Sequence, residues 1–553
     1  MSNSTSSQKL APVGQSAHID TFCRNQLPPR EMWPEMDWSR FPDLATRERL
    51  NCATELLDRR VANRQGQRTA LLSCSGRWSY VQLLETSNRI ARALVEDLGV
   101  VPGSRVLLRG PNTPMFAACW YAILKAGAVA VSTVSMLRPR EIIDILGKAQ
   151  IDLCLTDARV VDDCEQAVRS SGRANCRVVR FNCDDPNSLD RMMRTKTDNF
   201  DNCDTAPDDV AIIAFTSGTT GTGKGTMHFH RDLLVISDCF SANVLKPNED
   251  DIFCGSPPLA FTFALGGLLL FPASVGASVA LLEQGSPAHL LEGIQRFRPT
   301  ICITSPTGYR AMLPKLSQFE VGSLKKCVSA GEPLPSTTFE AWHQATGIRI
   351  IDGIGSTEML HIFISASDDD IRPGSTGRVV PGYEAKVVDE KGQDIETGKI
   401  GRLAVRGPTG CRYLGDTNHQ RNYVQDGWNI TGDAYRMDED GYFWFQSRID
   451  DLIVSAGYNI SGAEVENVLL EHPAVSECAV VGFPDLERGM IVKAYVVLKL
   501  GTSPSSGIAK ELQDFLKTQI APYKYPRAIE FMESLPRTST GKIQRNLLRR
   551  GAL

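Results

Sequence analysis

Residues 216–225 read Thr-Ser-Gly-Thr-Thr-Gly-Thr-Gly-Lys-Gly, a composition unsuited to a hydrophobic core. Glycine allows sharp backbone turns that direct several N–H groups at one anion. The hydroxyl groups add further donors, and Lys224 adds a positive charge. The preceding apolar run, residues 210–215, is typical of a buried strand. The sequence therefore predicts a phosphate-binding loop at the end of a buried strand.

Two other interpretations of this loop fit its residues less well. Gly218, Gly223 and Lys224 have the spacing of a P-loop, but Gly225 stands where a P-loop has the Ser or Thr that binds Mg²⁺. A P-loop also opens into a helix, and residues 225–230 are a poor helix start. A plain surface turn is the second alternative, but ten turn residues without Asp, Asn or Pro are uncommon.

Length and composition indicate a soluble protein of several domains. A chain of 553 residues is too long for one hydrophobic core. Its 42% hydrophobic and 22% charged content is ordinary for a soluble globular protein. A net charge of −4 without a Lys/Arg-rich run gives no sign of a nucleic-acid partner. The 15 cysteines are scattered and contain no C-x-x-C pair, which argues against zinc and disulfide frameworks. We therefore expect a reduced, cytoplasmic setting.

Two segments require a decision about membranes. Residues 1–15 are Ser-rich and lack an apolar core, so they are not a secretory signal and we expect them to be disordered. Residues 252–282 contain no charged residue and are long enough to cross a bilayer. The stretch is interrupted by Pro257, Pro258, Gly266, Gly267, Pro272 and Gly276. Because flanking basic and aromatic anchors are also missing, we interpret it as a buried strand–loop–helix unit beside a ligand pocket, with no membrane span.

Apolar runs alternate with amphipathic helical patterns through the first 350 residues. The predicted helix 115–125 lies between such runs, and the strand candidates are residues 105–109, 129–131, 151–156, 210–215, 278–282 and 300–304. Alternation of this kind favours α/β architecture with largely parallel sheets. After Gly374 the pattern changes to short strands at 383–389, 401–406 and 441–447, which predicts a β-rich subdomain.

The last hundred residues have an alternating pattern of their own. Predicted helices at 463–471 and 507–520 flank predicted strands at 477–482 and 492–498. This pattern indicates a separate small α+β domain. The expected organisation is a partly disordered N-terminal tail (1–44), a large α/β domain (45–447), a hinge (448–451) and a small mobile domain (452–553).

Further polar motifs follow the predicted strands. Residues 355–358 read Gly-Ser-Thr-Glu, and hydroxyl groups beside a carboxylate can bind a phosphate together with its Mg²⁺. Residues 431–433 read Thr-Gly-Asp, where an acidic side chain could accept ribose hydroxyls, and residues 331–333 read Gly-Glu-Pro. Lys542 ends a Gly/Thr-rich segment near the C-terminus. Each motif taken singly also fits an ordinary turn.

In this order and at these separations, the motifs resemble the adenylate-forming superfamily of acyl-CoA synthetases, adenylation domains and luciferases. The resemblance covers residues 45–550 and includes Arg448 with Asp450 and the triplet Gly457-Tyr458-Asn459. It implies a two-step reaction. A carboxylate attacks the α-phosphate of MgATP to give an acyl-adenylate and pyrophosphate, and the thiol of coenzyme A then displaces AMP.

The resemblance also implies roles for individual residues. Lys542 and Thr357 would contact the α-phosphate in catalysis, and Glu358 would bind the metal ion, Mg²⁺. Lys542 would stabilise the charge that develops there. The expected ATP- and AMP-binding residues are Thr216, Ser217, Gly218, Thr219, Thr220, Gly221, Lys224, Gly331, Glu332, Pro333, Asp352, Gly353, Asp433, Arg448 and Asn459.

Domain rotation is a further implication of the resemblance. Asp450 would be the hinge residue, and rotation would withdraw Lys542 and bring Gly457 and Tyr458 to the coenzyme A tunnel. Two positions depart from the family pattern. Gly223 replaces the usual proline before the loop lysine, and Val454 replaces a polar residue near the nucleotide.

The segment 352–363 resembles the benzoate-CoA ligase branch, and residues 227–232, 260–263, 266–269 and 521–526 resemble 2-aminobenzoate-CoA ligases. The implied acid pocket comprises Phe261, Phe263, Gly267, Ala330, Gly355, His361 and Ile362. Phe261 and Phe263 would flank a flat ring, Gly353 and Gly355 would leave a slot on its face, and His361 would meet an ortho substituent.

We therefore expect an aryl-CoA ligase that acts on 2-aminobenzoate, with benzoate as the second choice, in aromatic compound degradation. ATP, Mg²⁺ and coenzyme A are the expected cofactors and co-substrates. The alternatives are an enzyme that loads an acyl group onto a carrier protein and a ligase for medium-chain fatty acids. A luciferase-type oxidase has no support in the pocket residues. A homodimer is one alternative for the oligomeric state. His228 and His230 resemble half of a metal site, but without a third ligand we interpret both as structural.

Overall fold

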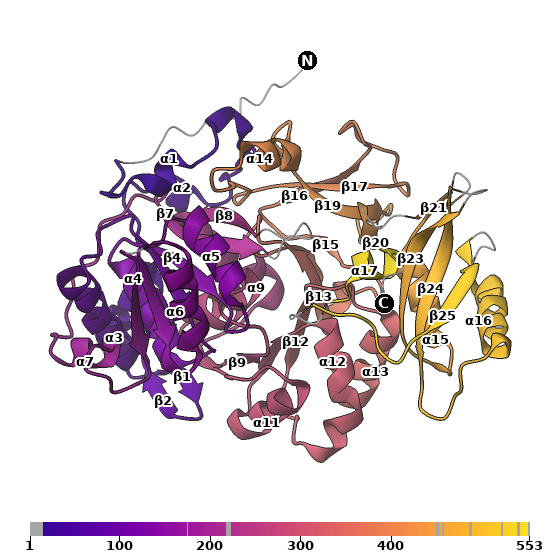
Figure 1. Cartoon of the computed structure of the whole chain (residues 1–553), viewed down its shortest axis with the longest axis horizontal. Helices are drawn as coiled ribbons and strands as arrows, with labels where there is room; N and C mark the ends of the chain where they lie inside the picture. Colours follow the sequence, from indigo (N-terminus) through magenta and orange to yellow (C-terminus); the bar gives the residue numbers. More distant parts are fainter. Residues whose placement is uncertain are drawn as a thin grey trace.

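The computed structural model describes residues 15–173, 175–216, 223–449, 453–455, 458–485, 489–520, 524–538 and 542–550. Two α/β sheets form the body of the molecule, with a β-rich layer above them and a small domain at one side (Figure 1). The mixed α/β architecture predicted from the sequence is confirmed. The expected disorder of the N-terminus concerns mainly residues 1–14, which lie outside the described residues.

The first sheet contains the strand that precedes the glycine-rich loop. Its order is β6 (Arg177–Phe181), β5 (Leu153–Asp157), β3 (Arg105–Arg109), β4 (Val129–Thr133), β7 (Val210–Thr216) and β8 (Lys224–Phe229). All neighbours are parallel except β8, which returns antiparallel to β7. Each strand predicted for this region is present.

Helices cover both faces of this sheet. The covering helices are α3 (Tyr80–Arg92), α4 (Pro114–Lys125), α5 (Pro139–Lys148), α6 (Val161–Ser170) and α7 (Leu189–Arg194). Successive strand residues point to opposite faces. Accordingly, Val106 and Leu108 belong to the core under α4, whereas Leu107 packs with α5 and α6 on the other side. Burial on both faces explains the nearly continuous apolar strands.

The second sheet is larger and also mainly parallel. Its order is β15 (Arg378–Val379), β14 (Ile362–Ser365), β13 (Ile350–Gly355), β12 (Lys326–Ala330), β11 (Ile301–Thr304), β9 (Ile252–Gly255), β10 (Ser278–Ala280), β1 (Thr69–Ser73) and β2 (Gly76–Ser79). Antiparallel pairs occur only at its two ends. Its helices are α8 (His230–Ile236), α9 (Thr262–Leu265), α10 (Phe271–Val275), α11 (Pro287–Phe297), α12 (Pro306–Met312) and α13 (Ser336–Thr346).

The uncharged run 252–282 forms β9, α9, α10 and β10, as the strand–loop–helix interpretation predicts. Its central residues Leu268, Leu269 and Leu270 are buried in the core of the large domain. In the part of the chain that the structure describes, no helix is both long enough and apolar enough to cross a bilayer.

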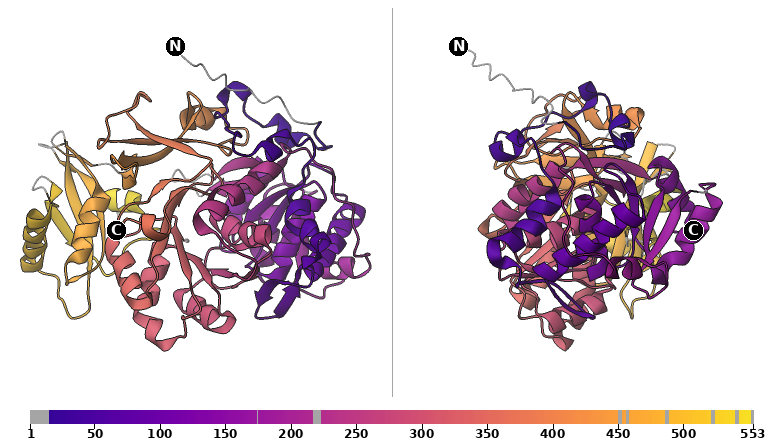
Figure 2. Two further views of the ribbon diagram at one scale, coloured as in Figure 1. Left: turned by 180° about the vertical axis from the view of Figure 1, so that it is seen from behind. Right: turned by 90° about the vertical axis from the view of Figure 1, so that its left-hand side faces the viewer.

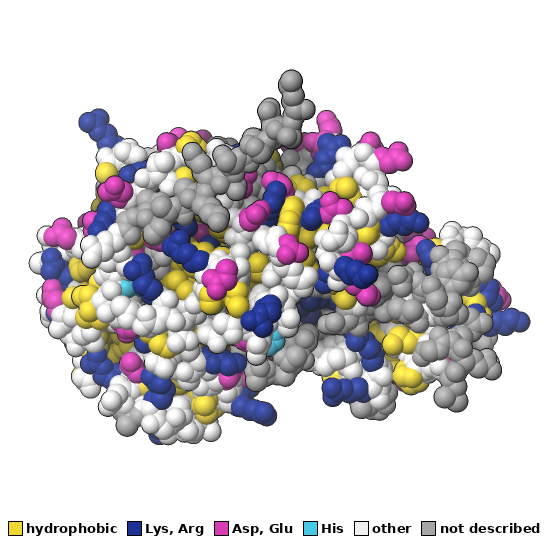
Figure 3. Space-filling view, turned by 90° about the horizontal axis from the view of Figure 1, so that it is seen from above, with side chains coloured by type: hydrophobic (Ala, Val, Ile, Leu, Met, Phe, Trp, Pro, Cys, Tyr) yellow, Lys and Arg dark blue, Asp and Glu magenta, His cyan; other side chains and the backbone are white. Residues whose placement is uncertain are grey.

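The β-rich layer contains β16 (Glu384–Val388), β17 (Ile400–Arg406), β18 (Val424–Gln425), β19 (Trp428–Met437) and β20 (Phe443–Arg448), with α14 (Thr417–Tyr423). Residues 15–44, which include α1 (Phe22–Asn25) and α2 (Pro42–Thr46), are packed along it and along the first sheet. Cys23 and Trp38 are buried there. On the face drawn in Figure 3, acidic and basic side chains are intermixed, as the small net charge implies.

The small domain has its own sheet and core. It contains β21 (Ile453–Ser455), β22 (Tyr458–Ile460), α15 (Gly462–Glu471), β23 (Val475–Asp485), β24 (Gly489–Leu498), α16 (Ser506–Gln519), β25 (Ala528–Phe531) and α17 (Arg545–Arg550). Figures 1 and 2 show this domain beside α12 and α13 of the large domain. An ion pair of 3.5 Å between Arg310 and Glu477 joins the two.

Candidate nucleotide and acid site

The glycine-rich segment connects β7 and β8 as the two arms of a hairpin, in which Thr216 pairs with Lys224. Residues 217–222, which include the predicted phosphate contacts Ser217, Gly218, Thr219, Thr220 and Gly221, lie outside the described residues. The chain leaves this segment as a strand, whereas a P-loop leads into a helix. Lys148 anchors the start of the returning arm, because its amine donates to the Gly223 carbonyl at 2.6 Å.

A tyrosine joins the returning arm of this hairpin to the predicted magnesium carboxylate. The hydroxyl of Tyr413 donates to Oε1 of Glu358 at 2.7 Å, and the Lys224 amine lies 5.9 Å from the centroid of the Tyr413 ring. The imidazole Nε2 of His228 donates to the carbonyl of Thr357 at 2.7 Å. The structure therefore brings two predicted site residues, Lys224 and Glu358, to Tyr413, a side chain that the sequence analysis missed, and Thr357 directly precedes Glu358 in the chain.

The position of Tyr413 is set by backbone hydrogen bonds that could not be predicted from the sequence. The Met227 N–H donates to the carbonyl of Arg412, and the Leu414 N–H donates to that of Gly225, both at 2.8 Å. Arg412 is fully buried and pairs with Asp232 at 2.9 Å. This pairing fixes residues 412–414 along β8. Tyr413 itself sits in no recognisable motif, so no sequence signal could have identified it.

Glu358 suits a divalent cation. A carboxylate oxygen is a ligand that Mg²⁺ prefers. Tyr413 occupies Oε1, and none of the described residues hydrogen-bonds Oε2, which leaves that oxygen available to a metal ion. No group of three or more His, Cys, Asp or Glu side chains that could hold a metal occurs among the described residues. Further ligands would therefore have to come from phosphate and water, as is usual for Mg²⁺.

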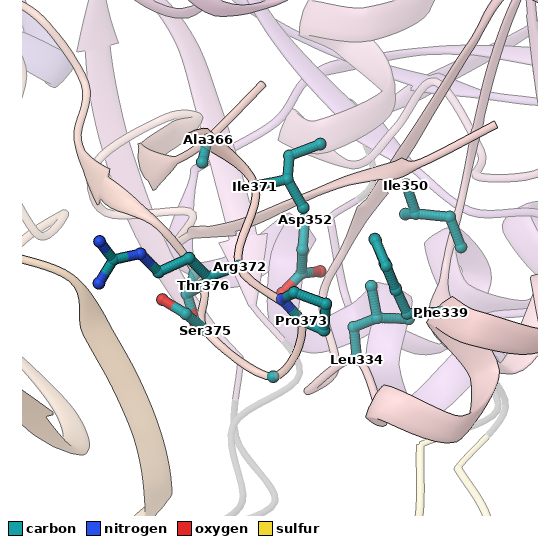
Figure 4. A pocket seen from close by; sticks show the side chains of 11 residues that line it. Leu334, Phe339, Ile350, Asp352, Ala366, Ile371, Arg372, Pro373, Ser375 and Thr376 are labelled. Atoms are coloured by element: carbon teal, nitrogen blue, oxygen red, sulfur yellow. The ribbon is translucent and has the colours of Figure 1, made fainter. Parts of the chain in front are cut away.

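Asp352, within β13, lines a narrow crevice. The crevice is lined by Leu334, Phe339, Ile350, Asp352, Ala366, Ile371, Arg372, Pro373, Gly374, Ser375 and Thr376 (Figure 4). Burial raises the pKa of Asp352 to about 8, although the nearby Ser329 hydroxyl and Gly353 N–H oppose the rise. Its Oδ1 is buried and has no partner among the described residues. The carboxyl is therefore able to accept a donor from a ligand.

The other predicted adenine-lining segment, Gly331-Glu332-Pro333, follows β12. Gly331 has a φ of +88°, a backbone conformation that glycine adopts at no steric cost. The carboxylate of Glu332 accepts from the hydroxyl of Thr307, on α12, at 2.6 Å. This hydrogen bond ties the segment to the helix that faces the small domain.

Asp433 and Arg448 are neighbours on paired strands. Asp433 of β19 lies opposite Arg448 of β20, and Nη1 of the arginine donates to Oδ1 of Asp433 at 3.0 Å. A Cβ on Gly432 would come within 2.9 Å of the guanidinium, so glycine leaves room for it. Burial raises the pKa of Asp433, and the charges of Arg448 and Lys542 oppose that rise.

The predicted acid-pocket residues lie around α9, β13 and β14. His361 is 3% exposed and is surrounded by the rings of Phe240, Phe263 and Phe271, at centroid distances of 5.4, 5.8 and 4.6 Å. Its Nε2 donates to the Phe263 carbonyl at 3.3 Å, and Nδ1 has no partner among the described residues. Burial lowers the pKa of His361 to about 3, so the ring is neutral at physiological pH.

The slot for the ring predicted beside Gly353 and Gly355 is not found where their side chains would be, because other residues fill that space. A Cβ on Gly353 would come within 2.7 Å of Ile362, and one on Gly355 within 2.7 Å of the His361 backbone. These glycines allow β14 to approach β13 closely. Gly267 allows a different close approach, to β11, because its Cβ would come within 2.5 Å of Ile303. Of the remaining pocket residues, Ala330 and Ile362 are buried, and Phe261 is half-buried before α9.

Four further predicted residues belong to the hinge and the small domain. Asp450 and Gly457 lie outside the described residues. Tyr458 and Asn459 belong to β22, where Asn459 pairs with Val454 and Tyr458 with Ser455, but their side chains also lie outside the description. His228 and His230 are both fully buried, and Nδ1 of His230 accepts from the Cys52 N–H at 3.2 Å. Both histidines thus have contacts within the fold.

This arrangement agrees with comparisons to known proteins. The AMP-binding enzyme family matches residues 58–413, and the AMP-binding enzyme C-terminal domain matches residues 464–542. The chain belongs to the AMP-binding enzyme family, which confirms the resemblance to adenylate-forming enzymes. It is 33% identical to the benzoate–CoA ligase of Thauera aromatica over 92% of this chain and 97% of that protein.

Two solved structures are similar over nearly the whole length. The anthranilate CoA ligase AuaEII, in complex with anthranoyl-AMP, has a TM-score of 0.86 and 36% identity, covering 90% of this chain and 97% of that one. A benzoate CoA ligase from Burkholderia xenovorans LB400 has a TM-score of 0.83 and 33% identity, covering 90% of this chain and 99% of that one. The two-domain α/β fold is shared with both.

Proposed function

We propose that this protein ligates an aromatic carboxylic acid to coenzyme A through an acyl-adenylate, with release of AMP and pyrophosphate. One observation carries the proposal. Glu358 and Lys224 both lie at Tyr413, where the glycine-rich hairpin returns: Oε1 of Glu358 accepts from the tyrosine hydroxyl, and the lysine amine lies 5.9 Å from the ring centroid. A metal-binding type of carboxylate and a cation beside a glycine-rich segment suit a site for MgATP, whose α-phosphate would react. The similarity to benzoate and anthranilate CoA ligases supports the same reaction.

The proposed first step joins the acid to AMP. A carboxylate oxygen attacks the α-phosphorus of ATP, and the bond to the bridging oxygen breaks so that pyrophosphate leaves with its electron pair. Lys542 and Thr357 would stabilise the α-phosphate oxygens, and Lys224 would bind the departing pyrophosphate. Mg²⁺, when bound at Glu358, would neutralise phosphate charge. Asp433 and Arg448 would hold the ribose, and Asp352 with residues 331–333 the adenine.

The proposed second step forms the thioester. The thiolate of coenzyme A attacks the acyl carbon, and AMP leaves with the oxygen that joined it to the acid. Loss of Lys542 from the site and entry of Gly457 and Tyr458 would accompany this step. Phosphate is a far better leaving group than the oxide that direct attack on a carboxylate would require.

We further propose 2-aminobenzoate, or an ortho-substituted acid with a similar donor, as the substrate. Nε2 of His361 donates to the Phe263 carbonyl, so Nδ1 of this neutral ring carries the lone pair. A buried acceptor without a partner favours a ligand that supplies an N–H or O–H. An ortho amino group supplies one, whereas benzoate does not. The rings of Phe240, Phe263 and Phe271 make the surroundings of His361 suitable for an aromatic acid.

A panel of acids tests both the proposed ligase reaction and the proposed substrate. Pyrophosphate release and thioester formation are measured with 2-aminobenzoate, 2-hydroxybenzoate, benzoate and medium-chain fatty acids, with coenzyme A or a phosphopantetheinylated carrier protein as acceptor. We expect the highest kcat/KM with 2-aminobenzoate and coenzyme A. Turnover of fatty acids without turnover of benzoates would contradict the aromatic substrate but retain the ligase. Transfer of the acyl group to the carrier protein but not to coenzyme A would favour an enzyme that loads carrier proteins.

A further inference from the structure

The carboxylate of Glu477 lies at the contact between the two domains and faces one arginine from each. From the small domain, Nη2 of Arg537 donates to Oε2 of Glu477 at 2.7 Å. From the large domain, Nη2 of Arg310, on α12, lies 3.5 Å from Oε1. The three side chains are only 25–31% exposed. Glu477 therefore links α12 to the C-terminal segment of the chain.

Arg537 is close to Lys542 in structure as well as in sequence. Arg537 forms an isolated antiparallel bridge with Ile543. The Thr538 N–H donates to the Lys542 carbonyl at 2.7 Å, and the Lys542 N–H donates to the Thr538 hydroxyl at 3.1 Å. These contacts hold the backbone of Lys542 against that of Thr538. A side chain that fixes Arg537 therefore also fixes the backbone at Lys542.

A second ion pair lies within the small domain, between α15 and α17. Both carboxylate oxygens of Glu466 lie 2.8 Å from Nη2 of Arg545. The charge of Glu466 raises the pKa of Arg545, and Glu332 of the large domain adds to that effect. Glu332 also accepts from Thr307, one turn before Arg310 on α12. The negative charge of Glu332, held at α12 by Thr307, thus favours the approach of the basic Arg545 of the small domain.

We propose that Arg310 is a positioning residue for adenylation: through Glu477 and Arg537 it holds the backbone at Lys542, whose side chain would reach the nucleotide. This inference rests on the proposed two-step reaction. In that reaction Lys542 is needed only while the acyl-adenylate forms. The contact made by Arg310 consequently acts in the first half-reaction and must be released before the second.

The decisive experiment separates the two half-reactions in Arg310→Met. Adenylation is followed as acid-dependent ATP–pyrophosphate exchange, and thioester formation is followed from preformed acyl-AMP and coenzyme A. Because the variant loses a partly exposed ion pair, we expect adenylation to fall by about three- to ten-fold. Thioester formation should stay within about two-fold of the wild type. Arg310→Lys, which keeps the charge, should recover most of the loss. Arg296→Met is the matched control, because the recorded contacts of Arg296 are with Cys74 and Phe297 in the large domain.

A double-mutant cycle identifies the partner. If Arg310 acts through Glu477, then Arg310→Met combined with Glu477→Gln should adenylate no more slowly than Glu477→Gln alone. Three results would overturn the positioning role. The first is a double variant whose loss equals the product of the two single losses. The others are equal losses in both half-reactions and an Arg310→Lys variant as slow as Arg310→Met. A wild type that adenylates no acid in the panel would contradict the proposed function. Normal adenylation by both the wild type and Arg310→Met would contradict only this inference.

Discussion

Replacing Asp352 with asparagine should change how stability depends on pH. Burial raises the pKa of Asp352 to about 8 in the folded protein, from its ordinary value of 3.8. Between these pH values the folded state retains a proton that the unfolded state has released, so the wild type loses stability as pH rises. Asparagine has no proton to release. The stability of Asp352→Asn relative to the wild type should therefore increase with pH.

The size of this effect follows from the pKa shift. Each pH unit between about 4 and 8 contributes up to about 1.4 kcal/mol. For a large domain, 1 kcal/mol corresponds to a Tm change of roughly 2 °C. The Tm of Asp352→Asn minus that of the wild type should thus rise by several degrees between pH 5 and pH 8.

Differential scanning calorimetry at pH 5, 6.5 and 8 measures this difference. Asp369→Asn is the control, because the Asp369 side chain is fully exposed and should leave the difference flat. Parallel Tm profiles for Asp352→Asn and the wild type would refute the reasoning. They would mean that water or a neighbouring group already compensates for the burial of this carboxyl.

Three further predictions concern the site itself. Lys542→Ala should reduce adenylation at least about 100-fold, as expected for the loss of a preorganised charge, while thioester formation from preformed acyl-AMP changes little; equal loss in both half-reactions would count against this role. Tyr413→Phe frees Oε1 of Glu358 from its hydrogen bond, and we expect the Mg²⁺ concentration for half-maximal adenylation to change by about three- to ten-fold; an unaltered Mg²⁺ titration would separate Tyr413 from the metal site. His361→Leu should reduce the preference for 2-aminobenzoate over benzoate by about ten-fold in kcat/KM, and an unaltered ratio would show that Nδ1 does not face the substrate.

Much of the fold could be predicted because the strands of the large domain are buried on both faces. Short apolar runs such as residues 105–109 and 210–215 are then readily predicted as strands. In the uncharged run 252–282, the prolines and glycines indicated where the chain turns. The supposed slot at Gly353 and Gly355 was wrong for a physical reason. A missing side chain indicates that something approaches the backbone closely, but only the register of β14 on β13 shows that the neighbour is the chain itself.

The glycine at position 225 explains why this loop is not a P-loop. A Cβ on Gly225 would lie 3.0 Å from Ile213 and 3.1 Å from Phe215, so the side chain that a P-loop needs here has no room. The Gly225 carbonyl instead accepts from the Leu414 N–H, next to the tyrosine that bonds Glu358. The phosphate hairpin and the proposed magnesium carboxylate are thereby joined through one short segment. Substitution of Gly225 should therefore disturb both together, because the close approach of β7, β8 and residues 412–414 depends on that missing side chain.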